Sequence, residues 1–417
     1  MESDRKEGLY SKPTTWERVA WCLNDTGNSA FPLVMITAIY SIYYTGVVVG
    51  DEVRGVSLWG LMISGSMGIV ALTSPLMGAL ADRKRWRKRL LFAYTLLGVA
   101  ATCACALVGP GMWLVGLLTI ALANIAFEGS LVFYDSLLPG LTTPERLGRW
   151  SGFGWSAGYV GGMVCLILCL PLAKSGEFDQ VFLLVGLWWL VFSLPLFLRV
   201  QERPPARCDD KGVWLQFKES LQRIRRNPDL FRFFIAFFLY NDGIATTVAF
   251  AALYAKNELG FDMATTIKLL IAVQLSAAVG SFVLGFVADK VGQVRTIIAT
   301  LFVWCALILA AYFVESATPF WFVAIGVGLV LGATQSCSRS FLAATVSQER
   351  AGEYFGFKAV AGKFSAVIGP LLFAFITYMT GSQRPAILSV GLLFVLGLVL
   401  MLRVDERRAA EVERLND

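Results

Sequence analysis

The chain has 417 residues, of which 56% are hydrophobic and 16% are charged, and its formal net charge is +6. A soluble protein carries about a quarter charged residues, so this composition excludes an ordinary globular domain and indicates a membrane protein. The sequence has no His, no nucleotide-binding glycine loop, and no cysteine pair with metal-site spacing. We therefore predict no catalytic residues, no metal and no cofactor, and the missing P-loop excludes an ATP-driven pump.

Long apolar stretches occupy most of the chain. They are continuously apolar rather than alternating, which excludes barrel strands, and several exceed the roughly 20 residues that cross a bilayer. We predict an all-α membrane protein with twelve transmembrane helices in two six-helix halves. The expected spans are 20–48, 57–81, 90–109, 112–138, 150–173, 179–199, 230–255, 264–287, 295–314, 319–343, 354–379 and 385–402. The predicted parts are an N-terminal segment (1–19), a first half (20–200), a linker (201–228), a second half (229–403) and a tail (404–417).

The basic residues indicate the orientation of these spans. Most of the 36 Lys and Arg residues fall in the tails and loops on the side of the two termini, and the opposite side has Arg54, Lys174, Lys256 and Arg384. By the positive-inside rule both termini are expected in the cytoplasm. The positive charge therefore reports topology and gives no reason to expect nucleic-acid binding. Residues 218–226 are expected to form a short amphipathic helix on the membrane surface.

The first span carries polar residues that return in the seventh. Asn24-Asp25 is followed by Gly27, and Asn241-Asp242 is followed by Gly243, an offset of 217 (242 − 25). Asp25 and Asn28 lie three residues apart and share a helical face. Three tyrosines at the outer end of this span, Tyr40, Tyr43 and Tyr44, are expected in an interfacial aromatic belt.

Two loop motifs also occur twice. GALADRK at 78–84 returns as GFVADK at 285–290, an offset of 207 (289 − 82), and SLLPGLTTPERLG at 136–148 returns as SFLAATVSQERAG at 340–352, an offset of 204 (349 − 145). Nearly equal offsets in the same order indicate two homologous halves, which in a membrane protein suggest a binding site at their interface. A glycine one turn before the aspartate lets a neighbouring helix approach closely. The aspartate can then accept from that helix's N-terminus or pair with an arginine.

We assign these loops to a cytoplasmic gate. Its predicted residues are Asp82, Arg83, Asp135, Glu145, Arg146, Asp289, Arg339, Glu349 and Arg350. Asp135 and Arg339 lie at nearly equivalent positions of the two halves, where a gate or packing ion pair is favoured over a contact with substrate.

Ionisable and amide groups inside the spans are costly, and by default they mark function. The predicted substrate and proton pathway consists of Asp25, Asn28, Asn124, Glu128, Asp242, Gln335 and Lys363. Glu128 lies about 15 Å from the nearer end of its span at 1.5 Å per residue. For Lys363, a buried ion pair and a contact with a substrate carboxylate remain alternatives. A buried carboxylate can exchange protons near neutral pH, and with no His available such a group would carry any proton coupling.

Several of these motifs resemble a known family. The repeated G-x3-D-[RK] loops resemble the signature of the major facilitator superfamily. WCLNDTGNSAF at 21–31, FYDSLLP at 133–139 and RWSGFGWSAGYVGG at 149–162 resemble its branch of autophagy-related vacuolar amino-acid effluxers and their bacterial relatives. The chain departs from the family's Tyr-Asp-Trp-Ala-Asn at 24–28, where it has NDTGN and lacks two aromatics. The resemblance implies transport, with efflux of amino acids or related solutes as the expectation.

The predicted function is therefore secondary active transport by alternating access. The expected substrate is a small polar solute such as an amino acid or short peptide, moved by proton-coupled efflux. Export of amphipathic drugs or lipids and a non-transporting sensor or scaffold are the alternatives, and nothing indicates an enzyme. The expected partners are the small-molecule substrate and membrane lipids, and the protein is expected to be a monomer in a bacterial inner membrane.

Overall fold

Twelve helical spans account for most of the chain. The computed structural model describes residues 13–202, 212–365 and 368–416. Among these residues, twelve helices are long and apolar enough to cross a membrane, which confirms the predicted number. Most extend beyond the predicted boundaries, the second, for example, over Glu52–Lys84, because polar ends of the helices continue past the apolar stretches.

The chain forms two compact units. Unit 1 comprises 1–143, 157–216 and 348–356, and unit 2 comprises 144–156, 217–347 and 357–417. Each unit therefore takes a short segment from the other half of the sequence. The division into 20–200 and 229–403 is a division of the sequence and stays a prediction.

Unit 1 contains the first six spans, apart from the start of the fifth. Its elements are α2 (Thr15–Asn28), η1 (Phe31–Ala38), α3 (Tyr40–Tyr43), η2 (Tyr44–Val49), α4 (Glu52–Lys84), α5 (Arg87–Ala104), η3 (Cys105–Leu107), α6 (Trp113–Ser136), η4 (Leu138–Gly140) and α8 (Phe178–Arg199). Helix α7 (Leu147–Lys174) starts in unit 2 and continues in unit 1.

Unit 2 contains the remaining spans and two helices outside them. Its elements are η5 (Pro144–Arg146), α10 (Pro228–Leu259), α11 (Met263–Val291), α12 (Gln293–Phe313), α13 (Ala317–Thr345), α15 (Ile368–Thr380), α16 (Gln383–Met401) and α17 (Glu406–Asn416). Helices α9 (Val213–Arg226) and α14 (Ala351–Ser365) start in unit 1 and continue in unit 2. The predicted amphipathic helix at 218–226 is confirmed as the second part of α9.

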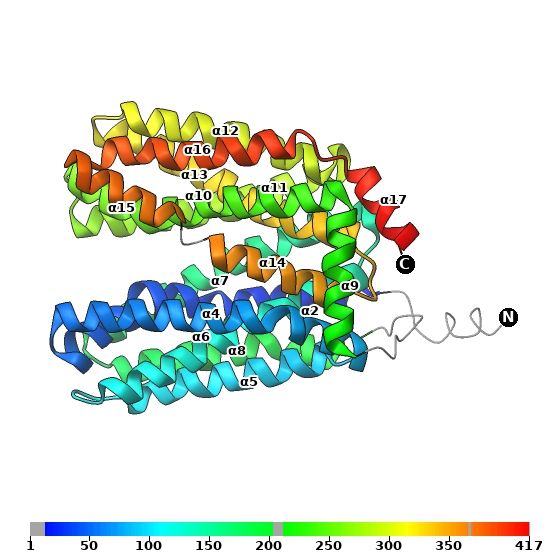
Figure 1. Ribbon diagram of the computed structural model, residues 1–417. Helices are drawn as coiled ribbons and strands as arrows, with labels where there is room; N and C mark the ends of the chain where they lie inside the picture. The colour runs from blue at the N-terminus through cyan, green and yellow to red at the C-terminus, as the bar shows by residue number, and fades with distance from the viewer. Residues whose placement is uncertain (1–12, 203–211, 366–367, 417) are drawn as a thin grey trace. The chain divides into compact units, whose positions relative to one another are not determined.

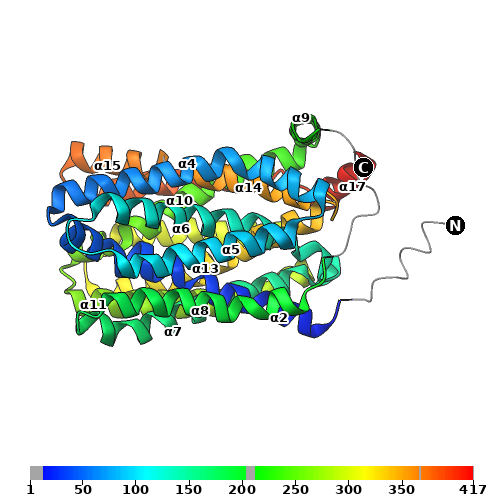
Figure 2. The same cartoon turned by 90° about the horizontal axis from the view of Figure 1, so that it is seen from below.

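The two units repeat one packing pattern. In unit 1, α2 packs on α8, and α6 packs on both α4 and α5 (Figures 1 and 2). In unit 2 the corresponding helices do the same: α10 packs on α16, and α13 packs on both α11 and α12. The duplication inferred from the loop motifs is therefore present in three dimensions.

Large aromatic side chains fill the centre of each unit. Trp189 of α8 is fully buried between Phe31 and Phe127, with ring centroids 5.7 and 6.0 Å away. In unit 2, Trp304 of α12 stacks on Phe394 of α16 at 4.6 Å and donates its indole N–H to Thr334 Oγ1 (3.2 Å). An indole can be buried at low cost when its N–H finds such a partner.

The second span of each half ends in the same kind of turn. Helix α4 ends at Arg85, with φ 57°, and α11 ends at Gly292, with φ 103°. The two positions differ by 207 (292 − 85), the same offset as the aspartates of the loop motif. A positive φ favours glycine, and Arg85 adopts it at a cost of about 1 kcal/mol.

The three tyrosines of the first span do not form an aromatic belt, so that prediction is wrong. Tyr40 and Tyr44 are fully buried. Tyr40, Tyr43 and Tyr44 donate their hydroxyls to backbone carbonyls of Gly116, Val108 and Trp113 at 3.2, 2.7 and 3.0 Å. These internal acceptors satisfy the hydroxyls, which therefore need no membrane interface.

Glycines let α7 approach α2 closely. A Cβ on Gly161 would lie 2.5 Å from the carbonyl oxygen of Thr26, and one on Gly162 would lie 2.9 Å from the carbonyl oxygen of Ser29. Backbone atoms cannot move aside as a flexible side chain can. These positions therefore require glycine for packing, as the glycine-rich sequence of this span suggests.

We expect Gly161→Ala to lower the free energy of unfolding by about 1–3 kcal/mol, since the added methyl overpacks the helix crossing. Thermal unfolding of the detergent-solubilised protein measures the effect. Gly60→Ala is the matched control, because a Cβ there meets no heavy atom within 4 Å. Equal stability of the two variants would contradict the close approach of α7 and α2.

Candidate functional site

Asp82 holds the start of another helix in unit 1. Its carboxylate accepts the backbone N–H of Gly352 (3.1 Å) and of Glu353 (3.0 Å), at the N-terminus of α14. Gly78, one turn earlier, lies directly against the backbone of Gly352. The predicted contact of this aspartate with a helix N-terminus is thus confirmed, and the absent side chain of Gly78 makes it possible.

Asp289 does the same in unit 2. It accepts the backbone N–H of Gly148 (2.8 Å), at the start of α7, and Arg149 Nε lies 2.6 Å from its other carboxylate oxygen. Gly285 packs against Gly148, and a Cβ added to Gly285 would lie 2.7 Å from the carbonyl oxygen of Gly148. Both copies of the loop motif therefore place a buried carboxylate on free N–H groups and on the positive end of a helix dipole.

The two copies take their arginine from different places. Arg149, which pairs with Asp289, belongs to the helix that Asp289 caps, and the equivalent position in the other copy is Glu353 (149 + 204). Asp82 pairs instead with Arg87 of α5 (2.6 Å), which also donates to the carbonyls of Gln348 and Glu349. Sequence reasoning named Arg83 and missed Arg87, because Arg87 lies beyond the turn at Arg85.

The other predicted gate residues lie near these contacts. Arg339 of α13 is buried, donates to Ser151 Oγ (2.9 Å) and Ser151 O (2.8 Å), and lies 5.4 Å from the centre of the Trp155 ring. It therefore holds the start of α7 within unit 2. The rest are half-buried or exposed in or beside the loops before α7 and α14: Asp135, Glu145, Arg146, Glu349 and Arg350. Their part in gating stays a prediction.

A fourth repeat, which the sequence analysis missed, supplies two more helix caps. LRVQER at 198–203 returns as LRVDER at 402–407, an offset of 204 (406 − 202). Glu202 accepts the backbone N–H of Arg87 (3.0 Å) and Lys88 (3.1 Å) at the start of α5. Glu406 accepts that of Val294 (3.2 Å) near the start of α12. Burial raises the pKa of both glutamates, against the lowering effect of these hydrogen bonds.

Four predicted pathway residues lie in unit 1. Glu128 of α6 is buried, with 8% exposure, and Asn124 one turn earlier donates to Ser66 Oγ of α4 (2.7 Å). Asp25 and Asn28 of α2 are buried, and Gly158 of α7 packs against Asp25. Asn124 thus joins two helices, which is a structural role, whereas Glu128 adds a buried carboxylate on the same face.

Two amide atoms on α2 have no hydrogen-bond partner among the described residues. Asn24 Oδ1 and Asn28 Nδ2 are buried and make no hydrogen bond with any described residue, and each side chain is only 2% exposed. A buried polar group without a partner costs roughly 1–3 kcal/mol, so such groups are retained at sites that bind something else. Sequence reasoning named Asn28 and gave Asn24 only as part of the repeat.

Two of the family-like motifs contact each other directly. Trp21 and Tyr134 stack with ring centroids 4.6 Å apart. Trp21 donates its indole N–H to the carbonyl of Tyr134 (3.1 Å), and Tyr134 donates its hydroxyl to the carbonyl of Trp21 (3.0 Å). This reciprocal pair fixes α2 against α6 beside Asp25.

The other three predicted pathway residues lie in unit 2. Asp242 of α10 is fully buried and accepts the backbone N–H of Gly369 (2.8 Å) of α15. Gln335 of α13 and Lys363 of α14 are half-buried. The eleventh span covers Ala351–Thr380, and residues 366–367 between α14 and α15 lie outside the described residues.

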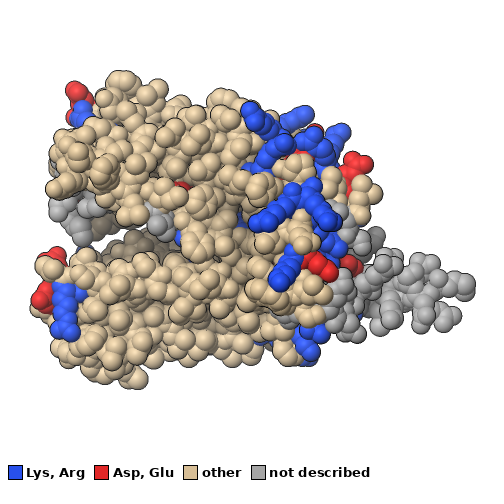
Figure 3. All heavy atoms as spheres, in the orientation of Figure 1, with Lys and Arg blue, Asp and Glu red and all other residues tan. Residues whose placement is uncertain are grey.

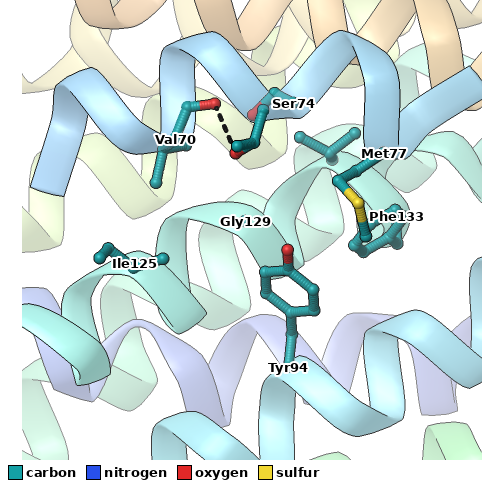
Figure 4. Close-up of a pocket in the computed structure, with 9 residues that line it drawn as sticks. Val70, Ser74, Met77, Tyr94, Ile125, Gly129 and Phe133 are labelled. Atoms are coloured by element: carbon teal, nitrogen blue, oxygen red, sulfur yellow. Dashed lines mark hydrogen bonds between the residues drawn. The ribbon is translucent and has the colours of Figure 1, made fainter.

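A small pocket in unit 1 contains none of the predicted residues. It lies between α4, α5 and α6 and is lined by Val70, Ser74, Met77, Tyr94, Ile125, Gly129 and Phe133, among others (Figure 4). The Tyr94 ring fills the space that a side chain at Gly129 would occupy. Among the described residues, no group of three or more His, Cys, Asp or Glu side chains is placed to hold a metal ion.

Comparisons with known proteins agree with this architecture. The family model described as "Vacuole effluxer Atg22 like" matches residues 42–413. An MFS-type transporter of Bacillus subtilis (strain 168), YxiO, is 29% identical, and the match covers 97% of this chain and 98% of that protein. Autophagy-related protein 22-1 of Neosartorya fischeri is 24% identical over 96% of this chain and 82% of its own length.

Solved structures show the same fold. The human organic anion transporter MFSD10 superposes with a TM-score of 0.77 at 16% identity, covering 93% of this chain and all of that one. The proton:xylose symporter XylE gives a TM-score of 0.76 at 13% identity, covering 96% of this chain and 98% of that one. At such identities the likeness shows the fold alone.

We expect Asp289→Asn to lower the free energy of unfolding by about 2 kcal/mol, because the charge-assisted bonds to Gly148 and Arg149 are lost. Asp262→Asn is the matched control. Asp262 also caps a helix, accepting the N–H of Thr265 (2.9 Å), but it is exposed, and Asn caps as well as Asp there. Thermal unfolding compares the two variants, and an equal loss of stability in both would contradict the stabilising role of Asp289 at the start of α7.

Removal of the cap on α12 gives a second prediction. Glu406→Ala is expected to cost about 1 kcal/mol of stability, whereas Glu411→Ala, exposed on the same helix, changes little. Burial raises the folded-state pKa of Glu406 above its usual value near 4.3. The stabilisation from its carboxyl is therefore greatest at low pH and declines as the pH rises through the folded-state pKa. Unfolding temperatures of both variants, measured at pH values below and above the folded-state pKa of Glu406, test this dependence. A difference in unfolding temperature between the two variants that widens as the pH rises would contradict the assignment.

Proposed function

Because the chain belongs to the Atg22-like vacuole effluxer family of the major facilitator superfamily, we propose that this transporter exports a small polar solute by alternating access. The proposed substrate class is amino acids or short peptides, and the proposed driving force is a proton gradient. The relatives are MFS-type transporters, and the chain is a multi-pass integral membrane protein. The substrate class and the coupling to a proton gradient are proposals that go beyond these findings.

The observation that carries the proposal is the set of carboxylates buried inside apolar spans. Asp25, Glu128 and Asp242 are each at most 8% exposed and lie in three different spans. An ionised carboxylate is costly there, whereas its protonated form is neutral and can be buried. A group that is charged in one state and neutral in another can link proton movement to a conformational change.

The two unpartnered amides support a zwitterionic substrate. Asn24 Oδ1 is an unused acceptor and Asn28 Nδ2 an unused donor, one helical turn apart on α2. An amino acid offers an ammonium group to the first and a carboxylate to the second. An amphipathic drug or lipid would leave both amide groups unsatisfied in an apolar site.

We also propose that the protein works as a monomer in a bacterial inner membrane with both termini in the cytoplasm. The Lys and Arg bias of the loops supports this orientation. Basic side chains gather around α9 and α17, the helices of the linker and of the C-terminal tail (Figure 3). The proposed partners are the solute and the membrane lipids.

Flux measurements in proteoliposomes test the proposal. We expect transport of an amino acid or peptide that accelerates with an imposed pH gradient in the wild type. Glu128→Gln is expected to remove this acceleration, because the amide cannot exchange a proton. Glu411→Gln, which alters an exposed carboxyl on α17, is the control and should keep it.

Two results would overturn parts of this proposal. A wild-type transport rate that does not change with the imposed pH gradient would contradict proton coupling. Flux of amphipathic drugs or lipids, with none of amino acids or peptides, would replace the substrate class.

A further inference from the structure

The turn between α4 and α5 in unit 1 carries a high density of positive charge. Residues 83–89 have the sequence RKRWRKR, in which six of seven residues are basic. Two of these belong to the fold, because Arg87 pairs with Asp82 and Lys88 donates to the carbonyl of Val200 (2.6 Å). The basic turn is defined here as the four exposed residues of this segment: Lys84, Arg85, Trp86 and Arg89.

Three side chains of the basic turn present donors that the fold does not use. Within the described residues, the ammonium of Lys84, the indole of Trp86 and the guanidinium of Arg89 have no recorded hydrogen bond or ion pair. Trp86 is 37% exposed, although tryptophan is normally well buried or placed at a membrane interface. These three donors therefore suit an acceptor outside the chain.

The fourth residue, Arg85, has a backbone conformation that favours glycine. It is the one residue other than glycine with a positive φ among those that the structure describes. The dipole at the end of α4 does not require a third basic residue, because Arg83 and Lys84 already lie in its last turn. Strained residues of this kind are retained where their side chains have a function. Since the Arg85 side chain is exposed, that function lies at the surface.

The corresponding turn of unit 2 shows that the fold does not need these side chains. Both turns have a capping aspartate, a residue with positive φ and a capping glutamate. At the offset of 207, the counterparts of the basic turn are Val291, Gly292, Gln293 and Thr296. The same kind of turn is thus built without the positive charges and without the indole. The basic turn is an addition to unit 1.

The place of the basic turn along the chain indicates its ligand. The second span ends at Lys84 and the third begins at Arg87, so the turn between them lies at the level of the lipid headgroups. Each Lys or Arg near an anionic membrane surface strengthens binding about fivefold. Tryptophan is favoured at the same depth. Basic groups around an exposed indole therefore complement a negatively charged phosphate ester at the membrane surface.

We propose that the basic turn binds the headgroup of an anionic phospholipid. Lys84 and Arg89 donate to the phosphate oxygens, and the planar guanidinium of Arg85 adds a charge-assisted pair of hydrogen bonds. The indole N–H of Trp86 donates to an ester or glycerol oxygen of the same lipid. A zwitterionic lipid carries its own ammonium group and leaves the positive charge of the turn uncompensated. The site lies within unit 1 and is independent of the transported solute and of its coupling.

Thermal unfolding of the full-length protein in neutral detergent, titrated with phosphatidylglycerol in mixed micelles, tests the site. We expect phosphatidylglycerol to raise the unfolding temperature of the wild type, because a ligand of the native state stabilises it. Phosphatidylcholine at the same mole fraction should not. The double variant Lys84→Gln/Arg89→Gln should need about 30-fold more phosphatidylglycerol for the same rise, since two basic groups are lost.

The matched control is Lys290→Gln/Arg295→Gln, which removes two exposed charges beside the corresponding turn of unit 2. It should respond to phosphatidylglycerol as the wild type does. Equal weakening in the two double variants would show a general effect of charge and would overturn the site.

Arg85→Gly separates lipid binding from folding. Without phospholipid, this variant is expected to unfold at or above the temperature of the wild type, because glycine adopts a positive φ freely. With phosphatidylglycerol, its affinity should fall about fivefold. A lower unfolding temperature without phospholipid would assign Arg85 to the fold and overturn its part in the site.

Two soluble anions distinguish the lipid from other ligands. Millimolar inorganic phosphate and a glutamate-rich peptide are both expected to leave the unfolding temperature unchanged. A rise with inorganic phosphate that Lys84→Gln/Arg89→Gln abolishes would make this a site for free phosphate. The same result with the peptide would make it a docking site for an acidic protein segment. Either result would overturn the lipid as the ligand.

Discussion

Free N–H groups at helix starts, buried where water cannot satisfy them, are the constraint on which this structure depends. Four carboxylates meet that need, each from outside the helix that it caps: Asp82 on α14, Asp289 on α7, Glu202 on α5 and Glu406 on α12. A carboxylate is suited to this role because it accepts two hydrogen bonds and carries the charge that the helix dipole favours. The glycines beside these contacts, such as Gly78 and Gly285, let the backbones approach.

The caps repeat between the two halves. Asp82 and Asp289 are copies of one loop motif, and Glu202 and Glu406 are copies of another, so these four serve the common framework of both halves. Each of the four holds a helix start within its own unit. The framework of the two units is therefore built in the same way twice.

Hydropathy and repeat spacing predicted the twelve spans, the duplication and the contact of Asp82 and Asp289 with a helix N-terminus, because these depend on local composition and on the repeated motif. The hexapeptides at 198–203 and 402–407 could have been found in the same way. Two features could not. Arg87 pairs with Asp82 across a turn, and Tyr40 and Tyr44 find acceptors deep in the bundle. Each depends on which side chain faces which backbone group, and that is decided by tertiary packing.

Amide hydrogen exchange resolved to single residues, on the protein in lipid nanodiscs, tests the role of the caps most directly. The account predicts slow exchange at the capped amides of Gly148, Gly352 and Glu353. It predicts faster exchange in the first turns of α6 and α8, where the residues at the cap positions, Met112 and Glu177, provide no side-chain hydrogen bond. Equal exchange at the two sets of helix starts would contradict the claim that buried carboxylates hold these helices in place.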